Sequence, residues 1–342
     1  MSDSEASKRT RRGSGAITLH DVARLAGVSP ITASRAINKP EQVSPELLKK
    51  VEDAVARTGY VPNRMAGGLA SSRSKLIAAV VPSTVISVFN ETIEALNNIL
   101  FDSGYQLMLG QSDYSSEREE LLLDSVIGRR PDGIFLAGVM QPSKGRARLM
   151  ASGIPVVETW DLTPTPIDML IGFSHKDIGL AVANYLIQKG KKRLAVIRAG
   201  DERADRRTVA YQEAIAQAGL PPPFVVNVGG ERSIHSGRAA MAKILADAPK
   251  TDAVFCSSDL LALGALTEAR HQNIEVPKQM AVMGFGDVPF VADMLPALTT
   301  VRINGGKIGQ LAAQYLMDRA EGKTVSEPIV DVGFSIIERD TA

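Results

Sequence analysis

The residues able to perform covalent or metal chemistry are few and widely separated. The chain has four histidines, His20, His175, His235 and His271, and one cysteine, Cys256. The histidines lack the spacing of a metal site, so we expect no metal and no cofactor. Cys256 ends an apolar run, which favours packing over a nucleophilic role. Because dinucleotide-binding glycine motifs, nucleophile elbows and phosphate loops are also absent, the sequence predicts that the protein is not an enzyme.

Basic residues, by contrast, are concentrated at the N-terminal end. Residues 1–75 contain 13 of the 39 Lys and Arg but only 7 of the 38 Asp and Glu, a net charge of +6 against −5 for the remainder. A basic end on a mildly acidic body predicts that the end meets a polyanion and the body does not. We interpret residues 1–17 as a disordered basic arm.

Composition excludes several classes of protein. Hydrophobic residues make up 44% of the 342 residues and charged residues 23%, as in soluble globular proteins of two domains or more. A single cysteine allows no internal disulfide. No apolar run reaches the ~20 residues of a membrane helix, and no hydrophobic region follows the charged N-terminus as in a secretory signal. We therefore expect a cytoplasmic protein without a membrane partner.

Residues 18–62 have the pattern of three short helices. Thr18, with Asp21 three positions on, is close to a capping box. Ser29 is a cap for a second helix with Pro30 at its first position, where the missing N–H costs nothing. Two short helices joined by a glycine-containing turn, with a third behind them, predict a helix-turn-helix module.

Beyond residue 76, short apolar strands alternate with amphipathic helices. LIAAVV (76–81) begins one run of four to five strands, MLIGF (169–173) begins a second, and a helix over 206–218 is one of those between strands. This alternation predicts two similar lobes, each with a parallel sheet and flanking helices. Ligands in such folds bind beyond the carboxyl ends of the strands, and a cleft between lobes is a common pocket.

Segments along nearly the whole chain resemble the LacI family of repressors. The most specific are TLHDVARLAGVSPITASRAIN (18–38) and VSPELLKKVEDAVARTGYVPN (43–63); PDGIFLAG, SSDLLALGAL and VMGFGD extend the match. The resemblance implies an all-α helix-turn-helix domain at 18–62, a hinge helix or linker at 63–75, and an α/β effector-binding and dimerisation core at 76–342. The core would have two periplasmic-binding-protein-like lobes, about 76–173 with 304–326 and about 174–302 with 328–342.

The resemblance places the second helix in the major groove of double-stranded operator DNA. Arg35 can bind guanine O6 and N7 in a bidentate manner. Ile31 offers only methyl contact, which we favour over packing because it lies near the exposed tip of the helix. The positions expected to contact DNA in and near this domain are Thr18, Leu19, Ser29, Pro30, Ile31, Thr32, Ser34, Arg35, Asn38 and Asn63.

The segment after residue 63 resembles the hinge helix of the family. It is short and contains two adjacent glycines, so we predict that it is helical only when two copies pack in the operator minor groove. Leu69 would be the wedge between bases, with Ala66 and Ala70 allowing close approach. Two copies imply a homodimer on a near-palindromic site. The chain stops at Ala342 without the leucine repeat of tetrameric members, which also favours a dimer.

Positions that match the ligand contacts of the family lie at predicted strand ends. They are Ser83, Phe89, Trp160, Asp161, Phe173, Arg203, Arg207, Asp259 and Asp287. Two of them have plain structural alternatives: Phe173 as a core residue, and Asp259 as the cap of a helix beginning at Leu260.

The chemistry of the ligand follows from one departure from the family. Sugar-binding members usually have Asp where Gly286 stands, and its loss with Arg203 and Arg207 retained favours an anionic ligand. PVVETWD, IGFSH and DER followed by Tyr211 resemble the gluconate-operon repressors, so gluconate, a ketogluconate or a 6-phosphate form is our hypothesis. A neutral sugar or a purine remains an alternative, and the ligand could be an inducer or a corepressor. A periplasmic sugar-binding protein would lack residues 18–63.

Overall fold

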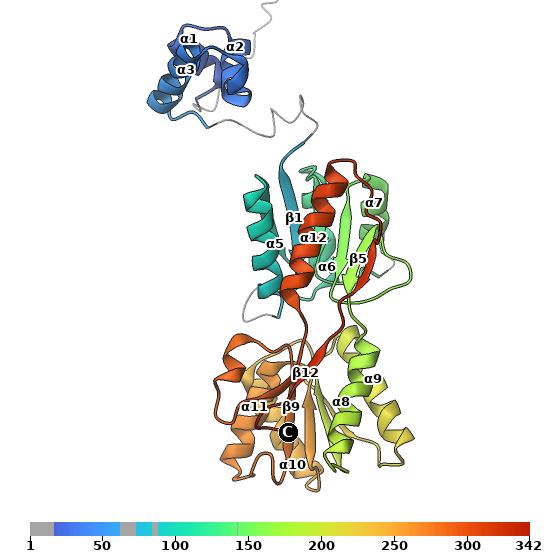
Figure 1. Cartoon of the computed structure of the whole chain (residues 1–342). Helices are drawn as coiled ribbons and strands as arrows, with labels where there is room; N and C mark the ends of the chain where they lie inside the picture. Colours follow the sequence, from blue (N-terminus) through green and yellow to red (C-terminus); the bar gives the residue numbers. More distant parts are fainter. Residues whose placement is uncertain (1–16, 62–72, 84–87, 142) are drawn as a thin grey trace, which may run out of the picture. The chain divides into compact units, whose positions relative to one another are not determined.

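The computed structural model describes residues 17–61, 73–83, 88–141 and 143–342. Two units separate by their internal contacts, Met1–Ser72 and Arg73–Ala342, and both are drawn in Figure 1. The hinge positions Asn63, Ala66, Leu69 and Ala70 lie outside the described residues, as does most of the basic arm. They remain predictions from the sequence.

The first unit contains the predicted helices. They are α1 (Leu19–Ala26), α2 (Pro30–Asn38) and α3 (Pro45–Thr58), with a short 3-10 helix at Pro40–Gln42. Their buried centre consists of Val22, Ala36, Val51 and Ala54. Small and branched side chains suit this centre because three short helices must approach closely to bury any apolar surface.

Local capping interactions explain where these helices begin. The backbone N and the hydroxyl of Thr18 donate to one carboxylate oxygen of Asp21 at 3.0 and 2.7 Å. The hydroxyl of Ser29 accepts from the backbone N of Thr32 at 3.1 Å, and Pro30 is the first helical residue. Both predicted helix starts are confirmed.

The second unit consists of two lobes, each with a six-stranded sheet. The first sheet has the order β11-β5-β4-β3-β1-β2 and the second β12-β10-β9-β8-β6-β7. The strands of the first are β1 (Leu76–Val81), β2 (Gln106–Gln111), β3 (Gly133–Leu136), β4 (Val156–Thr159), β5 (Met169–Gly172) and β11 (Ile329–Asp331). Those of the second are β6 (Leu194–Arg198), β7 (Phe224–Asn227), β8 (Ala253–Cys256), β9 (Ala281–Phe285), β10 (Thr299–Arg302) and β12 (Ser335–Ile337). All neighbours are parallel except β10 and β12.

Helices cover both faces of each sheet, as predicted. In the first lobe these are α5 (Asn90–Asp102), α6 (Ser116–Ile127), α7 (Lys144–Ser152) and α12 (Gly305–Ala320). In the second they are α8 (His175–Gln188), α9 (Glu202–Gln217), α10 (Ile234–Asp247) and α11 (Asp259–His271), with a 3-10 helix at Pro289–Ala292. Alternate residues of β1 enter different cores: Ile77 and Ala79 pack with α5 and α12, whereas Ala78 and Val80 pack with α6 and α7. Figure 1 shows α5 and α12 side by side in the first lobe.

The fold corrects two predicted boundaries. Residues 329–331 pair with β5 in the first lobe, so the chain returns to the second lobe after Asp331 and not at 328. The helix predicted over 206–218 begins at Glu202, because the carboxylate of Asp201 accepts from the backbone N of Arg203 and of Ala204, both at 3.1 Å. This earlier start places Arg203 in the first turn of α9.

Tyr211 is fully buried where α9 packs on the second sheet. Its ring stacks on Phe255 with the centroids 5.7 Å apart, but its hydroxyl has no hydrogen-bond partner among the described residues. Tyr211→Phe is therefore expected to leave the free energy of unfolding unchanged or raise it by up to about 1 kcal/mol, since an unsatisfied buried hydroxyl is removed. Tyr211→Ala should lower it by about 3–5 kcal/mol. Denaturant unfolding of both variants checks this, and a clear loss of stability in Tyr211→Phe would show that the hydroxyl is bonded.

Candidate functional site

The exposed face of α2 carries the residues expected to read DNA. Ile31 is 73% exposed, which agrees with its predicted place at the tip of the helix, and Arg35 and Asn38 are exposed as well. The ion pairs within the described part of this unit are Arg24–Asp21 and Lys50–Glu46. The guanidinium of Arg35 thus has no carboxylate partner there and is available to a ligand.

The remaining predicted positions in the described part of this unit lie at the starts of α1 and α2 and along α2. Thr18 and Ser29 are exposed, and Leu19, Pro30, Thr32 and Ser34 are half-buried. The amide N of Asn38 donates to the carbonyl oxygen of Ser34 at 2.9 Å, which holds the Asn38 side chain along the helix. Hydroxyls and free backbone N–H groups at a helix N-terminus are suited to phosphate.

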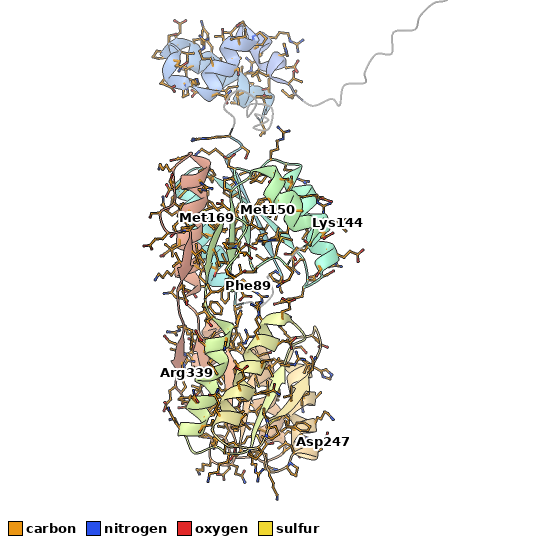
Figure 2. The ribbon with its side chains drawn as sticks, turned by 90° about the vertical axis from the view of Figure 1, so that its right-hand side faces the viewer. Phe89, Lys144, Met150, Met169, Asp247 and Arg339 are labelled. Atoms are coloured by element: carbon orange, nitrogen blue, oxygen red, sulfur yellow. The ribbon has the colours of Figure 1, made fainter. Side chains whose placement is uncertain are left out.

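A cavity of about 330 Å3 lies between the two lobes of the second unit. Its walls come from the carboxyl ends of strands in both sheets, where ligands of parallel folds bind. Six of the nine predicted ligand positions line it: Ser83, Phe89, Trp160, Arg203, Arg207 and Asp259. Figure 2 places Phe89 at the boundary between the lobes.

Arg207 is the chemically most distinctive residue of this cavity. It is 4% exposed, and its Nη1 donates to Nδ1 of His175 at 2.9 Å while Nη2 contacts the carbonyl oxygen of Ser257 at 3.4 Å. Among the described residues its Nε has no hydrogen-bond partner, and no carboxylate lies within ion-pair distance of its guanidinium. Burial lowers the pKa of Arg207 to about 10, so it remains a cation. The charges of Asp201 and Asp161 act on Arg207 without contacting it. A buried cation without a contacting carboxylate is costly, which makes the cavity suited to an anion.

The other two arginines of the cavity are already paired with Asp201. Nη2 of Arg232 lies 2.5 Å from one carboxylate oxygen of Asp201, and Nε of Arg203 lies 3.8 Å from the other. Burial alone would raise the pKa of Asp201, but the charges of Arg203, Arg232 and Arg207, with the backbone hydrogen bond from Ala204, outweigh it, so the pKa lies below its ordinary value. One carboxylate cannot neutralise two guanidiniums, so this wall keeps an excess of positive charge, and Arg207 is the arginine of the three that has no carboxylate within ion-pair distance among the described residues.

Aromatic rings line the cavity together with the arginines. The indole of Trp160 meets the ring of Phe89 edge-on, with centroids 4.9 Å apart, and its Nε1 donates to the hydroxyl of Thr92 at 3.2 Å. The guanidinium carbon of Arg207 lies 4.1 Å from the ring centre of Phe285. Such rings can pack the carbon skeleton of a ligand beside the arginines, which are suited to its polar end.

Helix packing sets the position of Arg207. α8 and α9 pack closely because Gly179 faces the backbone of Arg207: a Cβ at Gly179 would lie 2.2 Å from the carbonyl oxygen of Arg207. Any side chain at this position would push α9 outward and move the guanidinium. Gly179 is therefore a structural requirement for the cavity that the sequence alone did not reveal.

Three predicted ligand residues do not line this cavity. Phe173 is fully buried, with its ring edge-on to Trp160, so its alternative role as a core residue holds. The carboxylate of Asp161 binds the guanidinium of Arg206 at 3.0 and 2.5 Å and faces a smaller neighbouring cavity of about 140 Å3.

Asp287 is the third of these. It adopts a left-handed backbone conformation with φ 52°. Its carboxylate pairs with Arg302 and Arg339 at 2.5 and 2.7 Å. The neighbouring Gly286 explains why no side chain occupies the position of the family aspartate, since a Cβ there would lie 2.4 Å from Cγ1 of Val88 in the first lobe.

Asp259 lines the cavity and does not cap α11. The cap is Ser258, whose hydroxyl accepts from the backbone N of Leu261. The Asp259 carboxylate accepts from the hydroxyl of Thr300 at 2.6 Å and from the backbone N of Val288 at 2.9 Å. It is 2% exposed, and burial raises the pKa of Asp259 to about 6.

Replacing Asp259 by asparagine is expected to change the dependence of stability on pH. The native carboxyl keeps its proton up to about pH 6, whereas the unfolded chain releases it near the ordinary value of 3.8. The contribution of the Asp259 carboxyl to the free energy of unfolding is therefore fully present below its pKa in the unfolded chain. It is lost as the pH rises through its pKa in the folded protein. Between pH 4 and pH 7 the wild type should lose about 3 kcal/mol more than Asp259→Asn in denaturant unfolding.

The exposed carboxylate of Glu213 on α9 provides the control for that measurement. Glu213→Gln should follow the wild type over the same pH range. Parallel curves for wild type and Asp259→Asn would show that the buried carboxyl does not titrate with the raised pKa.

Sequence reasoning missed several residues of the cavity. They are His175, Asp201, Arg232, Tyr114 and Ser257, among others. Most of them follow the carboxyl end of a strand, so the rule that found Trp160 and Arg203 could have found them. For His175 the sequence offers only the missing spacing of a metal site and its place in the IGFSH segment. Within the described residues no group of three or more His, Cys, Asp or Glu could hold a metal ion.

Comparisons with known proteins show the family of the chain. Residues 18–63 match the family described as bacterial regulatory proteins, lacI family, and residues 183–342 match the periplasmic binding protein-like domain. The chain is 37% identical to the HTH-type transcriptional regulator GntR of Pseudomonas aeruginosa, over the full length of both. The chain belongs to the lacI family of bacterial regulatory proteins. As a lacI-family member it is a DNA-binding transcription regulator.

Solved structures place it in the same family. A LacI family regulator from Silicibacter pomeroyi is 31% identical with a TM-score of 0.89, over 95% of this chain and 99% of that one. The lac repressor dimer bound to operator and an anti-inducer has a TM-score of 0.80 at 23% identity, over 95% and 99% of the two chains, which shows the shared fold. The similar proteins of the family are named as transcriptional regulators, in agreement with the prediction that this chain is not an enzyme.

No helix in the described part of the lacI-family chain combines the length and apolarity that crossing a membrane requires.

Proposed function

We propose that this lacI-family regulator represses a sugar-acid catabolic operon and leaves its operator when gluconate, or a closely related sugar acid, occupies the cavity between the lobes. The observation that carries the proposal is Arg207, a buried guanidinium without a carboxylate partner among the described residues. A ligand carboxylate would neutralise it and accept two parallel hydrogen bonds.

The surroundings of Arg207 favour a hydroxylated acid over a simple one. Phe89 and Trp160 offer apolar surface, while Ser83, Ser257 and Ser258 line the same cavity. A sugar acid presents a carbon chain, hydroxyls and one carboxylate, which matches this combination. The GntR name of the similar Pseudomonas aeruginosa protein points the same way.

On the DNA side we propose a homodimer that reads a palindromic operator. α2 would enter the major groove, with Ile31 and Arg35 at base edges. Phosphates would be bound from Thr18, Leu19, Ser29, Thr32, Ser34 and Asn63. Ala66, Leu69 and Ala70 would form the minor-groove contact of two paired hinge segments. A similarly folded lac repressor is a dimer on its operator.

We propose that ligand binding changes operator affinity because residues of both lobes line the cavity. A ligand that binds residues of both would favour one arrangement of the lobes, and this would separate the hinge segments and weaken operator binding. Couplings of this kind are typically about 1–3 kcal/mol.

Trp160, the single tryptophan of the chain, supports a direct test. Purified protein is titrated with gluconate, glucose and a purine while tryptophan fluorescence and operator binding are followed. We expect a saturable change and release of operator with gluconate, and neither with glucose. A response only to glucose or to the purine would refute the sugar-acid proposal. Tighter operator binding with gluconate would make the ligand a corepressor and refute induction.

A further inference from the structure

His175 connects the two lobes at the wall of the cavity. It is the first residue of α8, directly after the crossover from β5, and is 4% exposed. Its Nε2 lies 3.0 Å from the carbonyl oxygen of Trp160 in the first lobe. Its Nδ1 lies 2.9 Å from Nη1 of Arg207 in the second lobe. One imidazole thus touches both a first-lobe backbone group and the guanidinium of Arg207.

The two partners fix where the imidazole carries its proton. A carbonyl oxygen can only accept, so Nε2 donates to Trp160. A guanidinium can only donate, so Nδ1 presents its lone pair to Arg207. His175 is therefore a neutral tautomer with a defined orientation. Burial, and then the charge of Arg207, also hold the pKa of His175 well below its ordinary value.

Packing prevents the imidazole from turning. The ring of Phe173 lies edge-on at 4.8 Å between centroids, and the ring of Phe285 lies at 6.4 Å. Trp160 has a left-handed backbone conformation with φ 64°, and it follows directly after β4, whose position in the first sheet is fixed by pairing with β3 and β5. The acceptor that His175 offers to Arg207 is held by both lobes.

We infer that His175 is a positioning residue for anion recognition, which keeps the guanidinium of Arg207 in place at the cavity by accepting its hydrogen bond while the Trp160 carbonyl holds the ring. This rests on the proposed function, because it names the group that makes Arg207 ready for a carboxylate. The other contact of Arg207, to Ser257, is longer at 3.4 Å, and its Nε has none among the described residues. His175 therefore provides the shortest of the contacts that orient this side chain.

Three variants separate the two hydrogen bonds. His175→Asn places an amide oxygen near the position of Nδ1 and can keep the bond from Arg207. His175→Gln places an amide nitrogen near Nε2 and can keep only the bond to Trp160. His175→Phe keeps the ring shape and loses both. Each is titrated with gluconate and with its neutral amide, and thermal unfolding confirms that each is folded.

We expect the Kd for gluconate to rise roughly 10- to 100-fold in His175→Gln and His175→Phe. His175→Asn should stay within a few-fold of the wild type, and the Kd for the neutral amide should change little in all three. A merely structural role would weaken both ligands together and follow the loss of thermal stability. Equal gluconate affinity in all four proteins, or rescue by Gln and not by Asn, would overturn the inference.

A ligand-free measurement keeps the two proposals distinguishable. The chain has four histidines, so the 15N resonances of the imidazoles can be assigned with His175→Asn as the reference. We expect a protonated Nε2 and an unprotonated Nδ1 in the wild type, with a change at Nδ1 in Arg207→Met. A protonated Nδ1, or no change in that variant, would refute the role of His175. Failure of the wild type to bind gluconate would instead refute the proposed effector.

Discussion

Replacing Arg207 by methionine is expected to give a protein that still binds its operator but no longer releases it when gluconate is added. The methionine fills similar space without the charge or the hydrogen bonds. Removing one partner of a buried, hydrogen-bonded charge pair costs about 2–5 kcal/mol of binding free energy, which raises the Kd for gluconate roughly 30-fold or more. Gluconate titrations followed by tryptophan fluorescence and by release of labelled operator measure both effects.

Two further variants make this result specific. Arg207→Lys retains the charge without the planar fork and should recover only part of the affinity. Arg148→Met removes a half-exposed arginine that pairs with Asp124 on the surface of the first lobe, and it should release operator like the wild type. Release by Arg207→Met at wild-type gluconate concentrations would remove the basis of the anionic-ligand proposal.

Replacing Arg35 by alanine is expected to reduce operator affinity and to relax the base preference at one position of each half-site. A bidentate contact from Arg to guanine contributes about 1–3 kcal/mol of discrimination, so operator binding should weaken roughly 5- to 150-fold. Binding to unrelated DNA should change far less. Binding sites are selected from random DNA with the wild type and with the variant, and the selected sites are then titrated. The selection gives the base preference at each position, and the titration gives the operator affinity.

Lys50 provides the matched control for the Arg35 experiment, because it is a cation of the same unit already paired with Glu46 on α3. Lys50→Ala should select the same sites as the wild type. If Arg35→Ala also selects an unchanged site with the same preference at every position, α2 does not read DNA through this residue.

Local chemistry made the DNA-binding unit predictable. Thr18 with Asp21, and Ser29 with Pro30, are capping signals that act within four residues, and the observed helices begin where these signals stand. The start of α9 was missed because its cap, Asp201, precedes a strongly polar turn without apolar periodicity. The family and the general architecture followed from motifs that extend along the chain.

The positions that were predicted wrongly are set by contacts between distant parts of the chain. The three residues of β11 belong to the first lobe only because they pair with β5, more than a hundred positions earlier. Asp287 stands at a strand end like a ligand residue, but Arg302 and Arg339 neutralise it from β10 and from the segment after β12. Neither partner is recognisable before the sheet order is known. His175 likewise acquires its importance from Trp160 and Arg207, which are separated from it by 15 and 32 positions.

The burial of Arg207 has a consequence for how the regulator responds to ionic strength. Mobile ions screen exposed charges effectively and buried ones poorly. DNA binding through exposed groups such as Arg35 should weaken steeply as the salt concentration rises. Binding releases counterions from the phosphates, and this release becomes less favourable when the surrounding solution already holds many ions. Gluconate binding at the enclosed guanidinium should change far less. An osmotic or ionic shift in the surroundings would therefore alter the occupancy of the operator while leaving the affinity for the metabolite nearly constant.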